Sequence, residues 1–557
     1  MSSTASLSSR LVASATRHGP LHSDDATIYA LSSAPGKAGI AVIRISGPAC
    51  LDRPKIYKAL CPSAPPIKPR YAAVRTLYGP AEASGDSDIL DRAAVVLYFP
   101  GPKSVTGEDV LELHVHGGPA TVKAVLGALP ATSRSSSSSS IRYAEPGEFT
   151  RRAFLNNRLD LAQVEALGDT LDAATEHQRR TAVRGSSGRL GRTYEAWRAQ
   201  LLAARAEIEA LIDFSEDQHF DESPRELLQN VSRHVTQLQQ RVRAHEAAAD
   251  RSSLLRHGIR IALVGPANAG KSSLMNLIVG REASIVSHEA GTTRDVVEAS
   301  LDIRGYLCTF ADTAGFRQVV AASGGAIEAE GIRRARQKAA DADVVVVVAS
   351  VDKDAASDTY VVSYDEETLR LAAQARQRMV VLNKCDVVPD ASTLSGLVDE
   401  FRRTVDQMMR ASQEREGDPN ENSQVPVMAI SCRAAEASAI GEPLLIEMDS
   451  ANSDPGGVHG LVDALAASFA SMTDLPPDEQ DLLGVTARQQ QLLAQCREHL
   501  DDFLAEATDE DADPDVVLAA EHLRYAADCL SRITGRGEAG DIEEVLGVIF
   551  EKFCVGK

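Results

Sequence analysis

Residues 265–273, GPANAGKSS, have the types and the spacing of a phosphate-binding loop. Gly265 and Gly270 stand where the backbone must turn its N–H groups toward phosphate oxygens. Lys271 supplies a positive charge for the β- and γ-phosphates, and the Ser272 hydroxyl is a ligand for Mg²⁺. A mostly apolar run precedes the loop and an apolar-periodic segment follows it. The loop is therefore expected to join a strand to the beginning of a helix.

Three segments further along the chain indicate that the nucleotide carries guanine. NKCD at 383–386 ends in Asp386, whose carboxylate can accept hydrogen bonds from guanine N1–H and N2–H₂, donors that adenine lacks. SCR at 431–433 is expected to support the base, and DTAG at 312–315 offers a carboxylate near Mg²⁺ and an N–H for the γ-phosphate. The residues expected to contact GTP are Asn268, Ala269, Gly270, Lys271, Ser272, Ser273, Ser287, Thr292, Thr293, Asp312, Thr313, Ala314, Gly315, Asn383, Lys384, Asp386, Ser431, Cys432 and Arg433.

The residues that would promote hydrolysis differ from those of a Ras-like enzyme. Thr293, in SHEAGTTRD at 287–295, is the candidate for a second Mg²⁺ hydroxyl that orders this segment when a γ-phosphate is present; the alternative is a plain turn. Phe316 follows DTAG where Ras-like proteins carry a water-orienting glutamine, and a phenyl ring cannot take that role. The amide oxygen of Asn268 could instead help to coordinate a monovalent cation. K⁺ would then stand where an arginine stands in other GTPases.

Periodicity divides the chain of 557 residues, which is too long for one core, into several domains. Residues 24–150 contain short strands at 40–45, 93–98 and 111–115 and a short helix at 122–129, which indicates a small α+β domain. The serine tract at 135–140 is expected to be a surface insertion.

Helical periodicity covers residues 151–255 and returns at 474–557, on both sides of a nucleotide domain at 256–473. Because each helical half alone has little to pack against, we expect one discontinuous all-α domain, and the whole chain is classed as multidomain α/β. The polar stretches at 352–367 and 435–457 are expected to be surface loops.

Composition limits which cellular compartment and which binding partners are expected. No apolar run approaches the ~20 residues that span a bilayer, and the eight cysteines form no C-x-x-C pair, so we expect no membrane span and a reducing compartment. Residues 1–23 carry arginine, many Ser and Ala, and no acid, as in a mitochondrial transit peptide; an ordinary disordered N-terminus, and hence a cytoplasmic protein, is the alternative. The net charge of −21 speaks against extensive nucleic-acid contact by this chain alone.

Several separated motifs together resemble one family. They are GIAVIRISG at 39–47, FPGPKSVTGEDVLEL at 99–113, PGEFTRRAFLN at 146–156 and FCVGK at 553–557, beside the phosphate loop, AGTTRD at 290–295 and DTAGF at 312–316. This combination is similar to MnmE (TrmE), the family of dimeric tRNA-modifying GTPases, from about Thr27 to Lys557. An Era-like GTPase of ribosome assembly or signalling, the main alternative, would lack PGEF and the terminal CVGK. A folate-binding scaffold with a decayed nucleotide domain is opposed by the intact Lys271, Ser272 and Asp386.

The resemblance implies specific roles for residues of this chain. K⁺ would be held by Asn268, Ser287, Glu289 and Thr292, although His288 and Glu289 depart from the more apolar family pattern. Mg²⁺ would be held by Ser272 and Thr293. The catalytic residues would be Lys271, Asn268 and a water-orienting Glu328, for which Glu330 competes because the insertion at 323–325 blurs the alignment. A tetrahydrofolate derivative, 5,10-methylene or 5-formyl, would contact Arg44, Glu112, Arg158 and Lys557. Cys554 is the family's C-terminal cysteine, and its role stays open between a reactive thiol and packing.

The resemblance also implies partners. The chain would be a homodimer that works with an FAD-dependent protein to add an aminomethyl-type group to C5 of the wobble uridine of tRNA, with the folate as the one-carbon source. The acidic charge suggests that the partner protein holds most of the tRNA. A mitochondrial matrix location would follow from the N-terminal segment.

Overall fold

A computed structural model describes residues 26–50, 56–79, 88–132, 140–214, 224–285, 300–310, 337, 339–354, 359–413, 425–440, 454–508, 515–536, 553 and 556. The chain forms two compact units, residues 1–168 with 531–557, and residues 169–530. Among the helices in these described ranges, none combines the length and the apolar character that a membrane crossing requires.

The first unit is built on a six-stranded sheet of order β3-β4-β5-β2-β1-β6. All neighbouring strands are antiparallel except β1 and β6, and the three strands predicted in this part of the sequence lie inside β2, β4 and β5. The elements are β1 (Thr27–Leu31), β2 (Ile40–Ser46), α1 (Ile56–Leu60), β3 (Ala73–Tyr78), β4 (Ile89–Phe99), β5 (Val110–His116), α2 (Pro119–Ala131), β6 (Ile141–Tyr143) and α3 (Glu148–Leu155).

The two faces of this sheet differ because side chains alternate along a strand. Ile43, Leu111 and Leu113 lie in a buried cluster with residues of α1 and α2. Arg44 and Glu112 are opposite one another in the β2–β5 register and belong to the other face, where Phe149 of α3 packs. The sheet therefore has one apolar face and one face that carries charged side chains.

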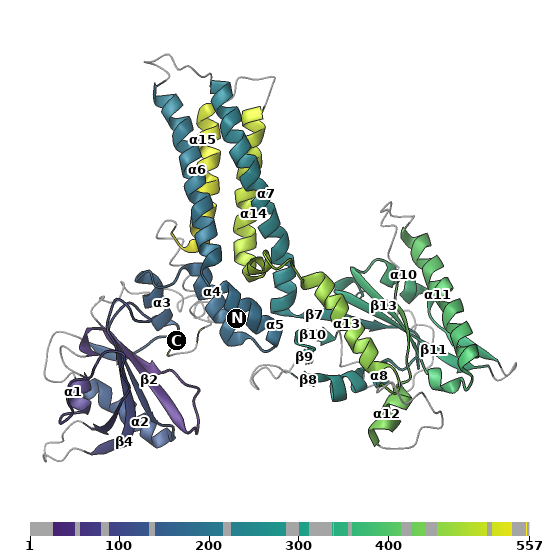
Figure 1. The fold of residues 1–557 in the computed structure, drawn as a ribbon, viewed down its shortest axis with the longest axis horizontal. Helices are drawn as coiled ribbons and strands as arrows, with labels where there is room; N and C mark the ends of the chain where they lie inside the picture. Colours follow the sequence, from purple (N-terminus) through teal and green to yellow (C-terminus); the bar gives the residue numbers. More distant parts are fainter. Residues whose placement is uncertain are drawn as a thin grey trace, which may run out of the picture. The chain divides into compact units, whose positions relative to one another are not determined.

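Helices from both sides of the nucleotide domain pack together in the second unit (Figure 1). They are α5 (Glu176–Gly185), α6 (Arg189–Phe214), α7 (Pro224–His257), α14 (Ala487–Thr508) and α15 (Val516–Thr534); α4 (Leu161–Asp172) precedes them. Between α7 and α14, Arg497 Nε donates to Glu246 at 2.9 Å. Ser252 on α7 donates to the carbonyl of Leu483, which precedes α14, at 2.5 Å. Residues more than 200 positions apart in the sequence thus share one helical bundle.

The side chain of His245 on α7 is buried beside two aromatic rings of α6. Its Nδ1 lies 3.2 Å from the Tyr194 hydroxyl, and its ring centroid lies 4.6 Å from that of Trp197. Burial lowers the pKa of His245 to about 4, whereas an unfolded histidine titrates near 6.5. Between these values the unfolded chain binds more protons than the folded one.

We therefore expect His245 to make the helical bundle less stable as the pH falls from 6.5 toward 4. At pH 5 its contribution to the free energy of unfolding should be about 2 kcal/mol smaller than above pH 6.5. Fluorescence of Trp197, the single tryptophan of the chain, reports unfolding in urea at this position. His245→Gln should remove that part of the pH slope, and His234→Gln, an exposed change on the same helix, should leave it intact. Equal slopes in wild type and His245→Gln would refute the assignment.

The nucleotide domain is an eight-stranded sheet with helices on both faces (Figure 1). Its order is β14-β13-β11-β7-β10-β9-β8, with β12 paired to β11. Residues of α8 and α13 share a buried cluster with one face, and residues of α10 and α11 share a cluster with the other. The elements are β7 (Ile259–Val264), α8 (Lys271–Leu277), β8 (Ala283–Ile285), β9 (Ser300–Ile303), β10 (Tyr306–Phe310), β11 (Val344–Lys353), β12 (Tyr360–Ser363), α10 (Glu366–Ala373), β13 (Gln377–Asn383), α11 (Ala391–Gln413), β14 (Val427–Ala429), α12 (Cys432–Ile440) and α13 (Val458–Thr473).

Two of the predicted surface loops are partly wrong. Within 352–367 the structure has the end of β11, the strand β12 and the beginning of α10. Tyr360 and Val362 pack on the buried cluster of α10 and α11, and Asp365 caps α10 by accepting from the N–H of Glu367. Within 435–457, α12 continues to Ile440. Polar composition concealed these elements because one edge strand and one short helix need only a few apolar contacts.

The helical bundle and the nucleotide domain meet at α5 and β10. The imidazole of His177 stacks on the ring of Tyr306, with centroids 3.9 Å apart, and its backbone N–H donates to the Gly305 carbonyl at 3.2 Å. A Cβ on Gly305 would lie 2.9 Å from His177. The glycine thus permits the close approach of the two parts.

Candidate nucleotide-binding site

The phosphate-binding loop connects β7 to α8, as the sequence predicted. Gly265 and Gly270 have φ of +142° and +96°, values that favour glycine, and Asn268 has φ of +62°. Lys271 is the first residue of α8, and its ammonium donates to the carbonyls of Gly265 at 2.8 Å and Pro266 at 2.6 Å. These two hydrogen bonds keep the positive charge of Lys271 beside the phosphate-binding loop. The side chains of Ser272 and Asn268 are exposed, whereas Ala269 is buried.

Asn383, at the end of β13, connects this loop to the segment at 431–433. Its Nδ2 donates to the carbonyl of Ala269 at 2.9 Å, and its Oδ1 accepts from the backbone N–H of Cys432 at 3.1 Å. The side chain is buried, so both bonds are made away from water. Three loops that follow parallel strands are thereby fixed relative to one another.

Asp386 is placed by a hydroxyl of the same segment. Ser431 Oγ donates to Asp386 Oδ1 at 2.6 Å and itself accepts from the N–H of Ala434 at 3.0 Å. The Asp386 carboxylate is half-buried, which keeps acceptor capacity available beside the loop. Arg433 is exposed in the first turn of α12.

Sequence reasoning missed a carboxylate that positions Lys384. Lys384 has φ of +62°, and its ammonium donates to Asp352 Oδ1 at 2.8 Å, while Ser350 donates to Asp352 Oδ2 at 3.1 Å. Asp352 comes at the carboxyl end of β11, next to the strand that carries the phosphate loop. An acid directly after the buried run at 344–351 was the available signal, and the expectation of a surface loop obscured it.

The charged face of the N-terminal sheet holds two of the residues predicted from the resemblance. Arg44 Nε donates to Glu112 Oε1 at 3.0 Å, and its guanidinium carbon lies 5.9 Å from the centroid of the Phe149 ring. His114 Nε2 lies 3.4 Å from the other Glu112 oxygen. The third predicted residue, Arg158, donates to the backbone carbonyl of Ser104 at 3.0 Å.

A partly buried ion-pair network that the sequence did not reveal lies in the same unit. Arg152 donates to Glu108 at 2.9 Å and to Glu148 at 3.1 Å, and Glu148 also accepts from Arg142 at 2.6 Å. Burial acts to raise the pKa of Glu148, but the hydrogen bond from Arg142 and the other donors outweigh it and hold the pKa below its ordinary value. PGEFTRR at 146–152 contains two members of this network.

An apolar cavity of about 520 Å³ lies on the α2 side of this sheet. Its lining includes Tyr29, Leu31, Val122 and Leu126, and does not include Arg44, Glu112 or Arg158, the predicted folate residues that the structure describes.

Two family models together match almost the whole described chain. The model described as the MnmE helical domain matches residues 161–554, and the one described as GTP-binding protein TrmE N-terminus matches residues 27–158. The chain belongs to the MnmE (TrmE) family of tRNA-modification GTPases. The match at 27–158 also favours this family over the Era-like alternative.

Relatives of the MnmE family match nearly end to end. The human mitochondrial 5-taurinomethyluridine-tRNA synthase subunit GTPB3 is 38% identical over 543 residues, 97% of this chain and 94% of that protein. The tRNA modification GTPase MnmE of Parvibaculum lavamentivorans is 38% identical over 537 residues, 95% of this chain and 100% of that protein. Among solved structures, the G domain of the T. maritima FeoB iron transporter is similar at 18% identity and a TM-score of 0.19, over 39% of this chain and 99% of that one.

Several residues predicted from the motifs or from the MnmE resemblance lie outside the described residues. They are Ser287, Glu289, Thr292, Thr293, Asp312, Thr313, Ala314, Gly315, Glu328, Glu330, Cys554 and Lys557. Of the residues at the nucleotide site, the structure therefore brings together the phosphate loop, 383–386 and 431–433.

Proposed function

We propose that this chain hydrolyses GTP to GDP and phosphate and uses the cycle to modify C5 of the wobble uridine of tRNA. The observation that supports the nucleotide site most directly is the pair of hydrogen bonds through which Asn383 joins the phosphate loop to the 431–433 segment. This supports recognition of phosphate and base at one site. Family membership supports tRNA as the molecule that is modified.

The described residues suit each part of this chemistry. Lys271 and the backbone N–H groups of the loop bind phosphate oxygens, and Asp386 accepts from the guanine N–H groups. The exposed hydroxyl of Ser272 fits Mg²⁺, which would also be held by Thr293 and would neutralise phosphate charge. The exposed amide of Asn268 fits K⁺, together with Ser287, Glu289 and Thr292, as a source of positive charge near the phosphates.

Hydrolysis is expected to depend on K⁺. GTP turnover in KCl should exceed turnover in NaCl at the same ionic strength by at least about 10-fold, because Na⁺ is too small for a site sized for K⁺ and the developing charge would lose about 1.4 kcal/mol or more of stabilisation. Release of phosphate under single-turnover conditions measures the rate. Asn268→Ala should reduce the difference between the salts. Equal rates for the wild-type chain in both salts would contradict the proposed role of K⁺.

Glu328 is proposed to orient the attacking water. Glu328→Ala should lower the hydrolysis rate by about 100-fold or more while GTP binding stays within about 2-fold, because a general base contributes to the transition state and little to ground-state binding. Glu330→Ala is the matched control, two residues away. If Glu330→Ala lost turnover and Glu328→Ala kept it, the two roles would be exchanged.

A tetrahydrofolate derivative, 5,10-methylene or 5-formyl, is proposed to bind the N-terminal domain through Arg44, Glu112, Arg158 and Lys557. Carboxylates of its glutamate tail suit the two arginines, and its pterin donors suit Glu112. Near the C-terminus, the carbonyl of Gly556 accepts from Ser32 at 2.8 Å beside β1, and a Cβ on Gly556 would lie 2.2 Å from the Leu31 carbonyl oxygen. Calorimetry with 5-formyltetrahydrofolate should show weaker binding to Arg158→Ala than to Arg151→Ala, and equal affinities would exclude Arg158.

The whole pathway is proposed to require a homodimer and an FAD-dependent partner protein, in the mitochondrial matrix. The mitochondrial designation of the human relative supports that location. Mass analysis of the wobble uridine in organellar tRNA from cells with and without this chain tests the function. The C5 group should disappear when the chain is absent, and its persistence would contradict the proposal. Light scattering of the purified chain with GTP tests the dimer, which a monomeric mass would exclude.

A further inference from the structure

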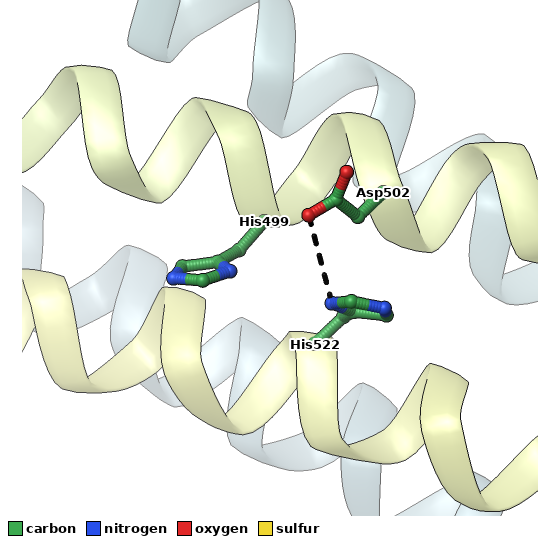
Figure 2. Close-up of side chains that lie close together, drawn as sticks. All are labelled: His499, Asp502 and His522. Carbon is green, nitrogen blue, oxygen red and sulfur yellow. Dashed lines mark ion pairs between the residues drawn. The ribbon is translucent and has the colours of Figure 1, made fainter.

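Two histidines and an aspartate converge between α14 and α15 (Figure 2). His499 and Asp502 are three positions apart on α14, a spacing that places them on the same side of a helix, and His522 comes from α15. One nitrogen of each imidazole and one oxygen of the carboxylate lie within 4.8 Å of one another. No residue of this cluster belongs to the nucleotide site or to the charged face of the N-terminal sheet.

The two imidazoles have coordinating capacity that the fold leaves unused. The Nδ1 atoms of His499 and His522 are buried, and among the described residues neither has a hydrogen-bond partner. His522 Nδ1 is 3.8 Å from Asp502 Oδ2, an ion-pair distance that exceeds a hydrogen bond. Burying a ring nitrogen without a partner is unfavourable, and the lone pair of a neutral imidazole nitrogen can be satisfied by a bound metal cation.

The positive charges nearest along both helices are already neutralised. Arg497 pairs with Glu246 and Asp501, and Arg524 pairs with Glu521 and Asp528. The carboxylate of the cluster, Asp502, is 58% exposed, whereas the His522 side chain is 19% exposed. A cation that enters from the solvent side would therefore meet one exposed acid and two less exposed rings.

We propose that His499, Asp502 and His522 bind a divalent transition metal, with Zn²⁺ as the preferred ion. Two imidazoles and a carboxylate are ligands that suit Zn²⁺, Co²⁺ and Ni²⁺ better than Mg²⁺ or Ca²⁺. With bonds of about 2.0–2.1 Å, tetrahedral ligands lie roughly 3.4 Å apart, so the three ligand atoms, now within 4.8 Å of one another, move closer together when the ion binds. Water completes the fourth position.

The metal would link α14 to α15 within a single chain. Because His499 and Asp502 come from one helix and His522 from the next, binding restricts the relative movement of the two helices. The nucleotide site keeps its own ligands, so basal GTP hydrolysis does not require this ion.

The test is equilibrium dialysis of the metal-free, untagged full-length chain against Zn²⁺ or Co²⁺ without nucleotide. One ion per chain is expected to bind, and the Co²⁺ complex should show visible absorption of nitrogen and oxygen ligation without a thiolate charge-transfer band. Saturation should raise the thermal transition of the bundle by about 5 °C, the shift for an ion present at about 100 times its Kd. Asp502→Asn and the double change His499→Gln with His522→Gln should each weaken binding by about 100-fold.

His234→Gln, an exposed histidine on α7, is the matched control and should bind as the wild-type chain does. Asp502→Asn changes an exposed group and so tests the site even if the double variant fails to fold. Retention of the bound ion in Asp502→Asn and in a folded double variant would overturn the proposal. A thiolate band would also overturn it, because the ion would then be bound by cysteine.

Discussion

Asp386→Asn is expected to weaken GTP binding by about 1000-fold and to make XTP the better ligand. In the proposed site the carboxylate offers two acceptors to guanine N1–H and N2–H₂, whereas the asparagine amide offers one acceptor and one donor. A lost charged hydrogen bond and an unpaired buried donor together cost about 4 kcal/mol, which corresponds to the 1000-fold change. Xanthine presents N1–H and a carbonyl at C2, which match the amide.

Titration with fluorescent GTP and XTP analogues measures this exchange. Ser431→Ala is the matched control, because it removes the hydroxyl that holds Asp386 Oδ1 at 2.6 Å but keeps the carboxylate. It should weaken GTP by about 10-fold, the loss of one hydrogen bond, without improving XTP. If Asp386→Asn bound both analogues like the wild-type chain, Asp386 would not be the residue that recognises guanine.

The phosphate loop could be predicted because its signal is local. Each motif follows an apolar run, and the carboxyl ends of parallel strands meet at one edge of a sheet. The sequence therefore predicted that residues 265–273, 383–386 and 431–433 share a site. It could not predict that Asn383 would join the other two segments, since either neighbour could have taken its hydrogen bonds.

Long-range pairing explains what the sequence left open. Asp352 contacts Lys384 only because β11 and β13 are adjacent, and Arg44 meets Glu112 only in the observed β2–β5 register. A shift of one residue would place Arg44 beside a residue of the opposite face. The sequence also could not predict the ion pairs among Glu108, Glu148 and Arg152, because they join the 101–109 segment to α3.

Gly265→Ala is expected to destabilise the nucleotide domain by more than about 4 kcal/mol. A Cβ at this position would lie 2.1 Å from the carbonyl oxygen of Val348, a backbone atom of the buried strand β11, and φ of +142° is strained for any residue with a side chain. Backbone cannot yield as a flexible side chain does, because Val264 next to the glycine is held in register with Val347. The substitution must therefore separate β7 from β11 or distort the loop.

The matched control is Gly396→Ala, an exposed position on α11 where a Cβ meets no atom within 4 Å. It should leave GTP affinity unchanged and stabilise the domain by up to about 1 kcal/mol, since alanine favours a helix more than glycine does. Urea unfolding followed by circular dichroism, with GTP titration on the same samples, separates the two outcomes. Should Gly265→Ala unfold at the wild-type urea midpoint and bind GTP normally, the close contact between the loop and β11 would not exist in solution.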